Sequence, residues 1–77
     1  MCVWYRSAPL CGNGNDCPTE YPYLESQASS SSDAQYCKNT FGAQCWTGEK
    51  NLCCGPNSVS LQNTGNYTCG NAFKKNE

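Results

Sequence analysis

Cysteine is the residue type in this sequence with the clearest chemical role. Eight cysteines occur among 77 residues. They are Cys2, Cys11, Cys17, Cys37, Cys45, Cys53, Cys54 and Cys69. This density is typical of disulfide scaffolds, and an even count lets every thiol pair. We therefore expect four disulfides, although about 105 pairings are possible.

Metal binding is the alternative use of so many cysteines. Zinc sites usually contain two cysteines separated by two to four residues, often together with histidine. Here Cys53 and Cys54 are directly adjacent, and histidine is absent. We expect no metal and no cofactor.

Catalytic residues are also hard to find. The absence of histidine removes the commonest general base and the Ser-His and Cys-His arrangements. Two of the six acidic residues could in principle serve a glycosidase. No pocket for them is evident in the sequence, so we expect a protein without enzymatic activity.

Two short motifs have both a structural and a functional interpretation. Residues 12–16 (GNGND) superficially resemble a phosphate or calcium loop, but the spacing fits neither motif. A turn rich in positive φ is the better interpretation. The triplet Asn66-Tyr67-Thr68 is an N-glycosylation sequon, which matters if the host is a eukaryote.

Aromatic side chains are the remaining candidates for binding. The sequence has two Trp, five Tyr and two Phe, which is many for so small a core. Exposed Trp and Tyr offer contact area to a protein or stacking faces to a sugar. We predict binding through Trp46, Tyr21, Tyr23 and Trp4. Alternatively, the two tryptophans cover disulfides as a small core.

Length and charge restrict the class of protein. A chain of this length forms one domain, residues 1–77, and needs its disulfides for stability. A net charge of −1 argues against nucleic acid as a partner, and no apolar run could insert into a membrane. We expect a monomer that is secreted, because disulfides persist in oxidising compartments. No secretory leader precedes Cys2, which is consistent with a leader already removed.

The first half of the chain predicts short elements that would position the cysteines and aromatic residues. Val3, Trp4 and Tyr5 predict a short strand. Residues 20–24 suit an extended path, and the serine-rich residues 25–32 predict a mobile loop. Residues 34–38 predict a short helix, capped by Ser32 or Asp33.

The second half predicts two hairpins. The first covers residues 44–54 and turns at Gly48 and Glu49. Alternation along its second strand places Cys53 and Cys54 on opposite faces, so each must find its partner on a different side. The second hairpin covers residues 58–69, and residues 70–77 look frayed. The predicted fold is therefore small and disulfide-rich, mainly β hairpins with long loops and one short helix.

Two stretches carry a resemblance to known proteins. WYRSAPLC near the start and CWTGEKNLCC later resemble short extracellular cysteine-rich modules of secreted invertebrate and fungal proteins. The shared pattern is W-Y-x-x-A-P-x-C followed by C-W-x-G-x-K-x-L-C-C, over about eighteen residues. The resemblance implies a fold more than an activity. Hydrophobins differ in having two Cys-Cys pairs, and hevein-type chitin-binding domains match only Leu52-Cys53-Cys54-Gly55.

Three functions fit these observations. The first is a secreted effector, toxin or defence protein that binds an extracellular macromolecule, either protein or glycan. The second is a carbohydrate-binding module that uses Trp46, Tyr21 or Tyr23. The third is an inhibitor of a protease or other enzyme, with residues 12–16 or 55–58 as its rigid reactive loop.

Overall fold

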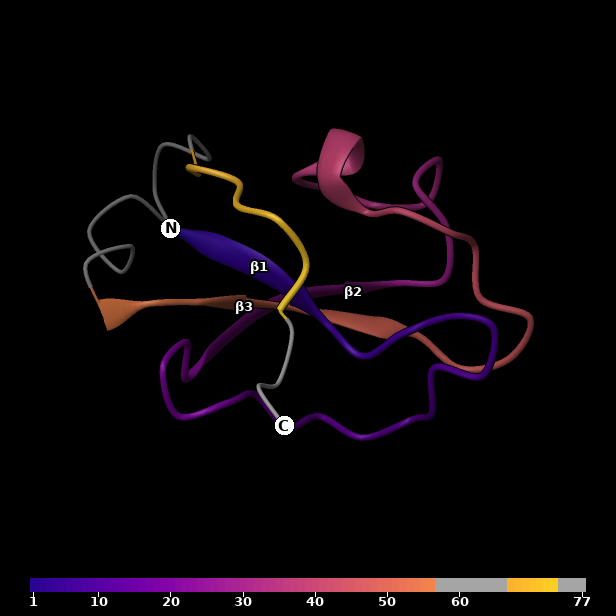
Figure 1. Cartoon of the computed structure of the whole chain (residues 1–77), viewed down its shortest axis with the longest axis horizontal. Coiled ribbons are helices and arrows are strands. Elements are labelled where there is room, and N and C mark those ends of the chain that lie inside the picture. Colours follow the sequence, from indigo (N-terminus) through magenta and orange to yellow (C-terminus); the bar gives the residue numbers. More distant parts are fainter. Residues whose placement is uncertain (57–66, 74–77) are drawn as a thin grey trace.

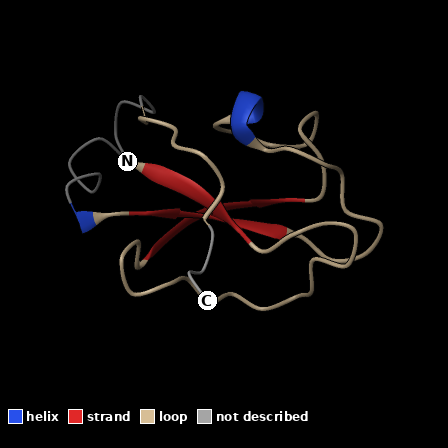
Figure 2. Ribbon diagram, viewed as in Figure 1, coloured by secondary structure: helices blue, strands red, loops and turns tan. Residues whose placement is uncertain are grey.

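A three-stranded antiparallel sheet is the framework of the molecule. The structure is a computed structural model and describes residues 1–56 and 67–73. The strands are β1 (Cys2–Tyr5), β2 (Tyr23–Ala28) and β3 (Lys50–Cys54), in the order β1-β3-β2 (Figure 1). β3 is the central strand of the sheet, and all five of its residues are buried. Long loops make up most of the described chain (Figure 2).

One face of the sheet carries Trp4, which packs there against Phe41. Cys2 pairs with Cys54, and Trp4 with Leu52, so these side chains share one face. Trp4 is fully buried there, with its ring 4.9 Å from that of Phe41 in an edge-on contact. Its indole Nε1 donates to the backbone oxygen of Cys37 at 2.9 Å, so the polar atom of this core residue is satisfied.

All eight cysteines form disulfides, as the composition predicted. The pairs are Cys2–Cys54, Cys11–Cys45, Cys17–Cys53 and Cys37–Cys69. The adjacent residues Cys53 and Cys54 do face opposite sides of β3. Cys54 bonds to its neighbour in β1, while Cys53 bonds to the loop before β2. The predicted fold class, small and disulfide-rich with mainly β structure, is confirmed.

The first predicted hairpin is wrong. Residues 44–47 do not pair with β3, because β1 and β2 occupy both edges of that strand. They lie instead beside residues 9–11, where Leu10 and Thr47 form a parallel bridge. Most of the second predicted hairpin, residues 58–69, lies outside the described residues. Of its last residues, Cys69 makes an isolated parallel bridge to Cys2.

The predicted loop over residues 25–32 is partly wrong. Residues 25–28 belong to β2, and only residues 29–32 form turns and bends. A polar sequence can form this strand because its pairing with β3 uses backbone groups, and Ala28 alone in β2 is fully buried. A register shift between Leu24 and Ser26 marks a bulge at Glu25.

The short helix lies later in the chain than predicted. Residues 34–37 are not helical, and a single 3-10 turn, η1 (Lys38–Thr40), follows them. Cys37 has a φ of 57°, in the left-handed region, so a right-handed helix cannot pass through it. The contacts of Cys37 with Cys69 and with the Trp4 indole are consistent with this local conformation.

The described part of the C-terminal segment is not frayed. The Gly70 N–H donates to the Cys2 carbonyl at 2.8 Å, and the Phe73 N–H to the Trp4 carbonyl at 3.0 Å. This segment thus covers the outer edge of β1 (Figure 1). Residues 74–77 of the predicted frayed tail lie outside the described residues.

Candidate functional site

Trp46 is the most exposed large apolar side chain of the described chain. Its exposed fraction is 80%, and that of Leu10, on the adjoining segment, is 69%. We call the paired segments, residues 9–11 and 45–47, the Trp46 ribbon. Trp46 N–H donates to the Pro9 carbonyl at 2.7 Å, and Cys11 N–H to the Thr47 carbonyl at 3.1 Å. The Cys11–Cys45 disulfide cross-links the two segments.

The ribbon is anchored to the body of the protein. Cys45 N–H donates to the Ser29 carbonyl at 2.8 Å, just after β2. On the other side, a Cβ added to Gly48 would overlap the backbone oxygen of Gly12, so the two backbones are in close contact. Trp46 is therefore presented on a segment with restricted freedom, which reduces the entropy lost when a partner binds.

A buried asparagine holds the loop of residues 12–16. Asn51 is fully buried in β3, and its Nδ2 donates to the carbonyls of Gly14 at 2.9 Å and Asp16 at 2.8 Å. Its Oδ1 accepts from Gln27 Nε2 at 2.9 Å. Sequence reasoning missed this residue. The signal was an asparagine inside a strand otherwise suited to burial, since asparagine is depleted in strands.

Arg6 holds the same loop from the other side. Its Nη1 donates to the Cys11 carbonyl at 3.2 Å, and its Nη2 pairs with the Asp16 carboxylate. This hydrogen bond lowers the pKa of Asp16 below its ordinary value. The Arg6 Nε is buried, and within residues 1–56 and 67–73 it has no hydrogen-bond partner.

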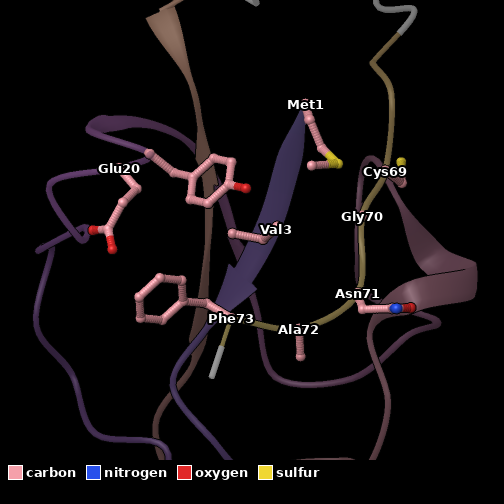
Figure 3. Close-up of a pocket in the computed structure, with 9 residues that line it drawn as sticks. Met1, Val3, Glu20, Cys69, Gly70, Asn71, Ala72 and Phe73 are labelled. Atoms are coloured by element: carbon pink, nitrogen blue, oxygen red, sulfur yellow. The ribbon is translucent and has the colours of Figure 1, made fainter. Parts of the chain in front are cut away.

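Three half-buried aromatic rings form a cluster on the face of the sheet opposite Trp4. The Phe73 ring makes edge-on contacts with Tyr5 at 5.8 Å and with Tyr21 at 6.3 Å between centroids. Hollows of about 610 Å³ and 280 Å³ both have Phe73 in their walls. Figure 3 shows residues that line the larger one, with Glu20 on the left, Asn71 on the right and Phe73 below Val3. Tyr5, Arg6 and Asp16 line the smaller one.

The four aromatic residues predicted to bind do not form one surface. Trp4 is in the core and cannot contact a partner, because it lies on the face of β1 where Phe41 packs against it. Tyr23 is 44% exposed but pairs with Cys54, at the opposite end of β3 from the ribbon. Tyr21 is half-buried against Phe73. The alternative in which tryptophans cover disulfides therefore holds for Trp4 and is wrong for Trp46.

Other predicted sites can be placed only in part. Asn66, of the glycosylation sequon, lies outside the described residues, as do residues 57 and 58 of one proposed inhibitory loop. The other loop, residues 12–16, forms neither a regular element nor a turn, and of its residues Gly12 alone has a positive φ, at 80°, so the predicted turn rich in positive φ is wrong. Within residues 1–56 and 67–73, no group of acidic, histidine or cysteine side chains could hold a metal ion. No helix of that same part of the chain could cross a bilayer.

Fold and disulfides define a class: this is a small, disulfide-rich β protein. Comparison with family models, curated proteins and solved structures finds no match to the chain. The resemblance to secreted cysteine-rich modules therefore stays a prediction. Four disulfides are typical of proteins in oxidising, extracellular compartments.

Proposed function

We propose that this chain is a secreted, non-catalytic binding protein, an effector, toxin or defence protein that contacts an extracellular protein through Trp46. The observation that carries the proposal is the 80% exposure of Trp46 on a disulfide-linked ribbon. Tryptophan is among the residues that contribute most to protein interfaces, and burying it removes a large apolar area from water. A solvated tryptophan on a restrained segment suits this role.

The charge of the ribbon and of the whole chain supports a protein partner over nucleic acid or an anionic membrane. The ribbon itself contains no charged residue, and the whole chain has a net charge of −1. Long-range electrostatic steering towards nucleic acid or an anionic membrane is therefore weak. The carbohydrate-binding alternative that combines Trp46 with Tyr23 loses support, because the two lie at opposite ends of β3.

The proposal predicts that Trp46→Ala abolishes most of the binding to a protein partner. Labelled wild-type protein is screened against an array of extracellular protein domains and, in parallel, against a glycan array. Any protein retained is then titrated with wild type, with Trp46→Ala and with Tyr23→Ala as the control. We expect at least a thirtyfold weaker affinity for Trp46→Ala, about 2 kcal/mol, and less than a twofold change for Tyr23→Ala.

Two results would contradict the proposal. One is equal binding by wild type and Trp46→Ala, provided both variants are oxidised and have the same circular dichroism. The other is an array on which Trp46-dependent binding occurs only to sugars, which would favour the carbohydrate-binding alternative.

A further inference from the structure

The two hollows beside Phe73 combine aromatic and polar groups in a way that the Trp46 ribbon does not. We call them together the Phe73 groove. Tyr5 and Phe73 stand in the wall of the smaller hollow, and Tyr21 and Phe73 in that of the larger one. All three rings are half-buried, so each keeps part of its surface free while the rest is packed in place. A fixed, partly exposed ring is a suitable surface for the C–H face of a sugar.

Polar groups stand beside these rings. Arg6 lines the smaller hollow with a side chain that is 24% exposed. Nη1 and Nη2 each carry two N–H groups, and the Cys11 carbonyl and Asp16 each accept from one of these nitrogens, so the guanidinium has further N–H groups to offer a ligand. Asp16 lines the same hollow and uses Oδ1 for its contact with Arg6. A donor and an acceptor side by side match a pair of neighbouring sugar hydroxyls, since each hydroxyl can both donate and accept.

The Arg6 and Asp16 side chains are already oriented. Nη1 of Arg6 is held by the Cys11 carbonyl, and the backbone of Asp16 is held by Asn51. A ligand would therefore find these groups in place and would not need to order them.

Charge selects among the possible sugars. Glu20 stands in the larger hollow, and the smaller one contains an Arg–Asp pair with no net charge. A sugar acid would bring its carboxylate towards the Glu20 side chain, and the two like charges would repel. At about 610 Å³, the larger hollow has the size of pockets that bind small organic ligands, roughly 300–1,000 Å³.

We propose that the Phe73 groove binds a neutral oligosaccharide. One sugar ring lies against Phe73 and Tyr5, with its hydroxyls bonded to Arg6 and Asp16, and the chain continues past Phe73 towards Tyr21. This site is separate from the Trp46 ribbon. Its existence does not depend on the proposed protein partner.

The test is an NMR titration of the oxidised, ¹⁵N-labelled protein with neutral trisaccharides of glucose, mannose and N-acetylglucosamine. Trigalacturonate serves as the acidic comparison. We expect at least one neutral trisaccharide to give saturable shifts at the amides of residues 5, 6, 16, 21 and 73. Trigalacturonate should bind at least tenfold more weakly.

Variants then separate the contributions. Phe73→Leu keeps an apolar side chain for packing but removes the ring, and it should weaken binding at least tenfold. Arg6→Lys keeps the positive charge opposite Asp16 but lacks the planar guanidinium that donates to several partners at once, and a loss of about fivefold is expected. Trp46→Ala should bind the sugar like wild type.

Three outcomes would overturn the proposal. These are no saturable shift at 10 mM of any neutral trisaccharide, wild-type affinity in Phe73→Leu, or shifts that map to the Trp46 ribbon. Because Trp46→Ala is the control here and the critical variant for the protein partner, failure of one proposal is distinguishable from failure of the other.

Discussion

Lys50 illustrates how a charged residue can be part of this small core. It is 5% exposed, its Nζ donates to the Phe41 carbonyl at 2.7 Å, and its ammonium lies 4.4 Å from the centre of the Phe41 ring. These contacts tie the first residue of β3 to the segment over Trp4. Burial removes water from the ammonium and lowers the pKa of Lys50 below its ordinary 10.5.

The first prediction at this scale concerns Lys50→Met. Methionine fills a similar volume and removes the desolvation cost of the charge, but it leaves the Phe41 carbonyl without its donor. We expect a free energy of unfolding at pH 7 that is unchanged or up to roughly 2 kcal/mol higher. Chemical denaturation with intact disulfides measures it, and Lys38→Met, at an exposed position, is the control.

The pH dependence of the same pair of proteins has a definite sign. Between the lowered pKa of folded Lys50 and about 10.5, the unfolded chain holds a proton that the folded chain has released. Stability of the wild type relative to Lys50→Met should therefore rise with pH in that range. Tyr67 has a pKa raised to about 12, first by burial and then by its hydrogen bond to Glu25, and it acts oppositely above pH 10. Because Tyr67 is present in both proteins, its effect cancels when the stability of Lys50→Met is subtracted from that of the wild type. If the free energy of unfolding of the wild type, relative to that of Lys50→Met, falls or stays level as pH rises, Lys50 is not buried in charged form.

At the scale of elements, glycine contacts decide where the ribbon and the loop meet. Gly48 and Gly42 both have positive φ, at 75° and 84°. They differ in surroundings: a Cβ on Gly48 would strike the Gly12 backbone, whereas one on Gly42 would lie 3.5 Å from Lys50 Nζ. Gly48 thus lies where two segments distant in sequence meet. A side chain at Gly42 would make only an ordinary van der Waals contact.

We predict that Gly48→Ala is more destabilising than Gly42→Ala. Both variants carry the cost of a left-handed alanine, about 1–2 kcal/mol. Gly48→Ala must also separate two backbones, which breaks the hydrogen bond of 2.9 Å from Glu49 N–H to the Gly12 carbonyl. Denaturant unfolding should show a further loss of at least about 1 kcal/mol, since a hydrogen bond between two half-buried residues is lost. Equal losses in the two variants would mean that residues 12 and 48 are not in contact.

For the molecule as a whole, the disulfides connect segments that a small apolar core could not hold alone. Cys11–Cys45 and Cys17–Cys53 span nearly the same sequence separation, 34 and 36 residues. The chain-entropy model therefore assigns both about the same stabilisation, at most about 4 kcal/mol, since the other bridges shorten the effective loops. They differ in what they position: the first holds the Trp46 ribbon, and the second holds the loop before β2.

We predict that removing either bridge by paired Cys→Ser substitution lowers global stability to a similar extent. Only the variant without Cys11–Cys45 should also loosen the ribbon. Native-state hydrogen exchange of the Trp46 amide, which donates to Pro9, should accelerate in that variant more than the loss of global stability explains. In the variant without Cys17–Cys53, the exchange of this amide should follow global stability. The same acceleration in both variants would contradict the proposed role of Cys11–Cys45.

The sequence by itself determined the features that depend on composition and on neighbouring residues. Eight cysteines predicted four disulfides, the run from Val3 to Tyr5 predicted a strand, and alternation placed Cys53 and Cys54 on opposite faces. Each of these follows from local chemistry or from the geometry of a single strand.

Only the tertiary structure decided which segments meet. Strand pairing uses backbone groups that every residue has, so the sequence of β3 could not show that β1 and β2 would take its two edges in place of residues 44–47. The roles of the two tryptophans followed from this arrangement. Both are large and apolar, yet Trp4 lies on a covered face of the sheet and Trp46 on a ribbon outside it. The Phe73 groove likewise exists because residues distant in sequence, Tyr5, Tyr21 and Phe73, are brought together by the fold.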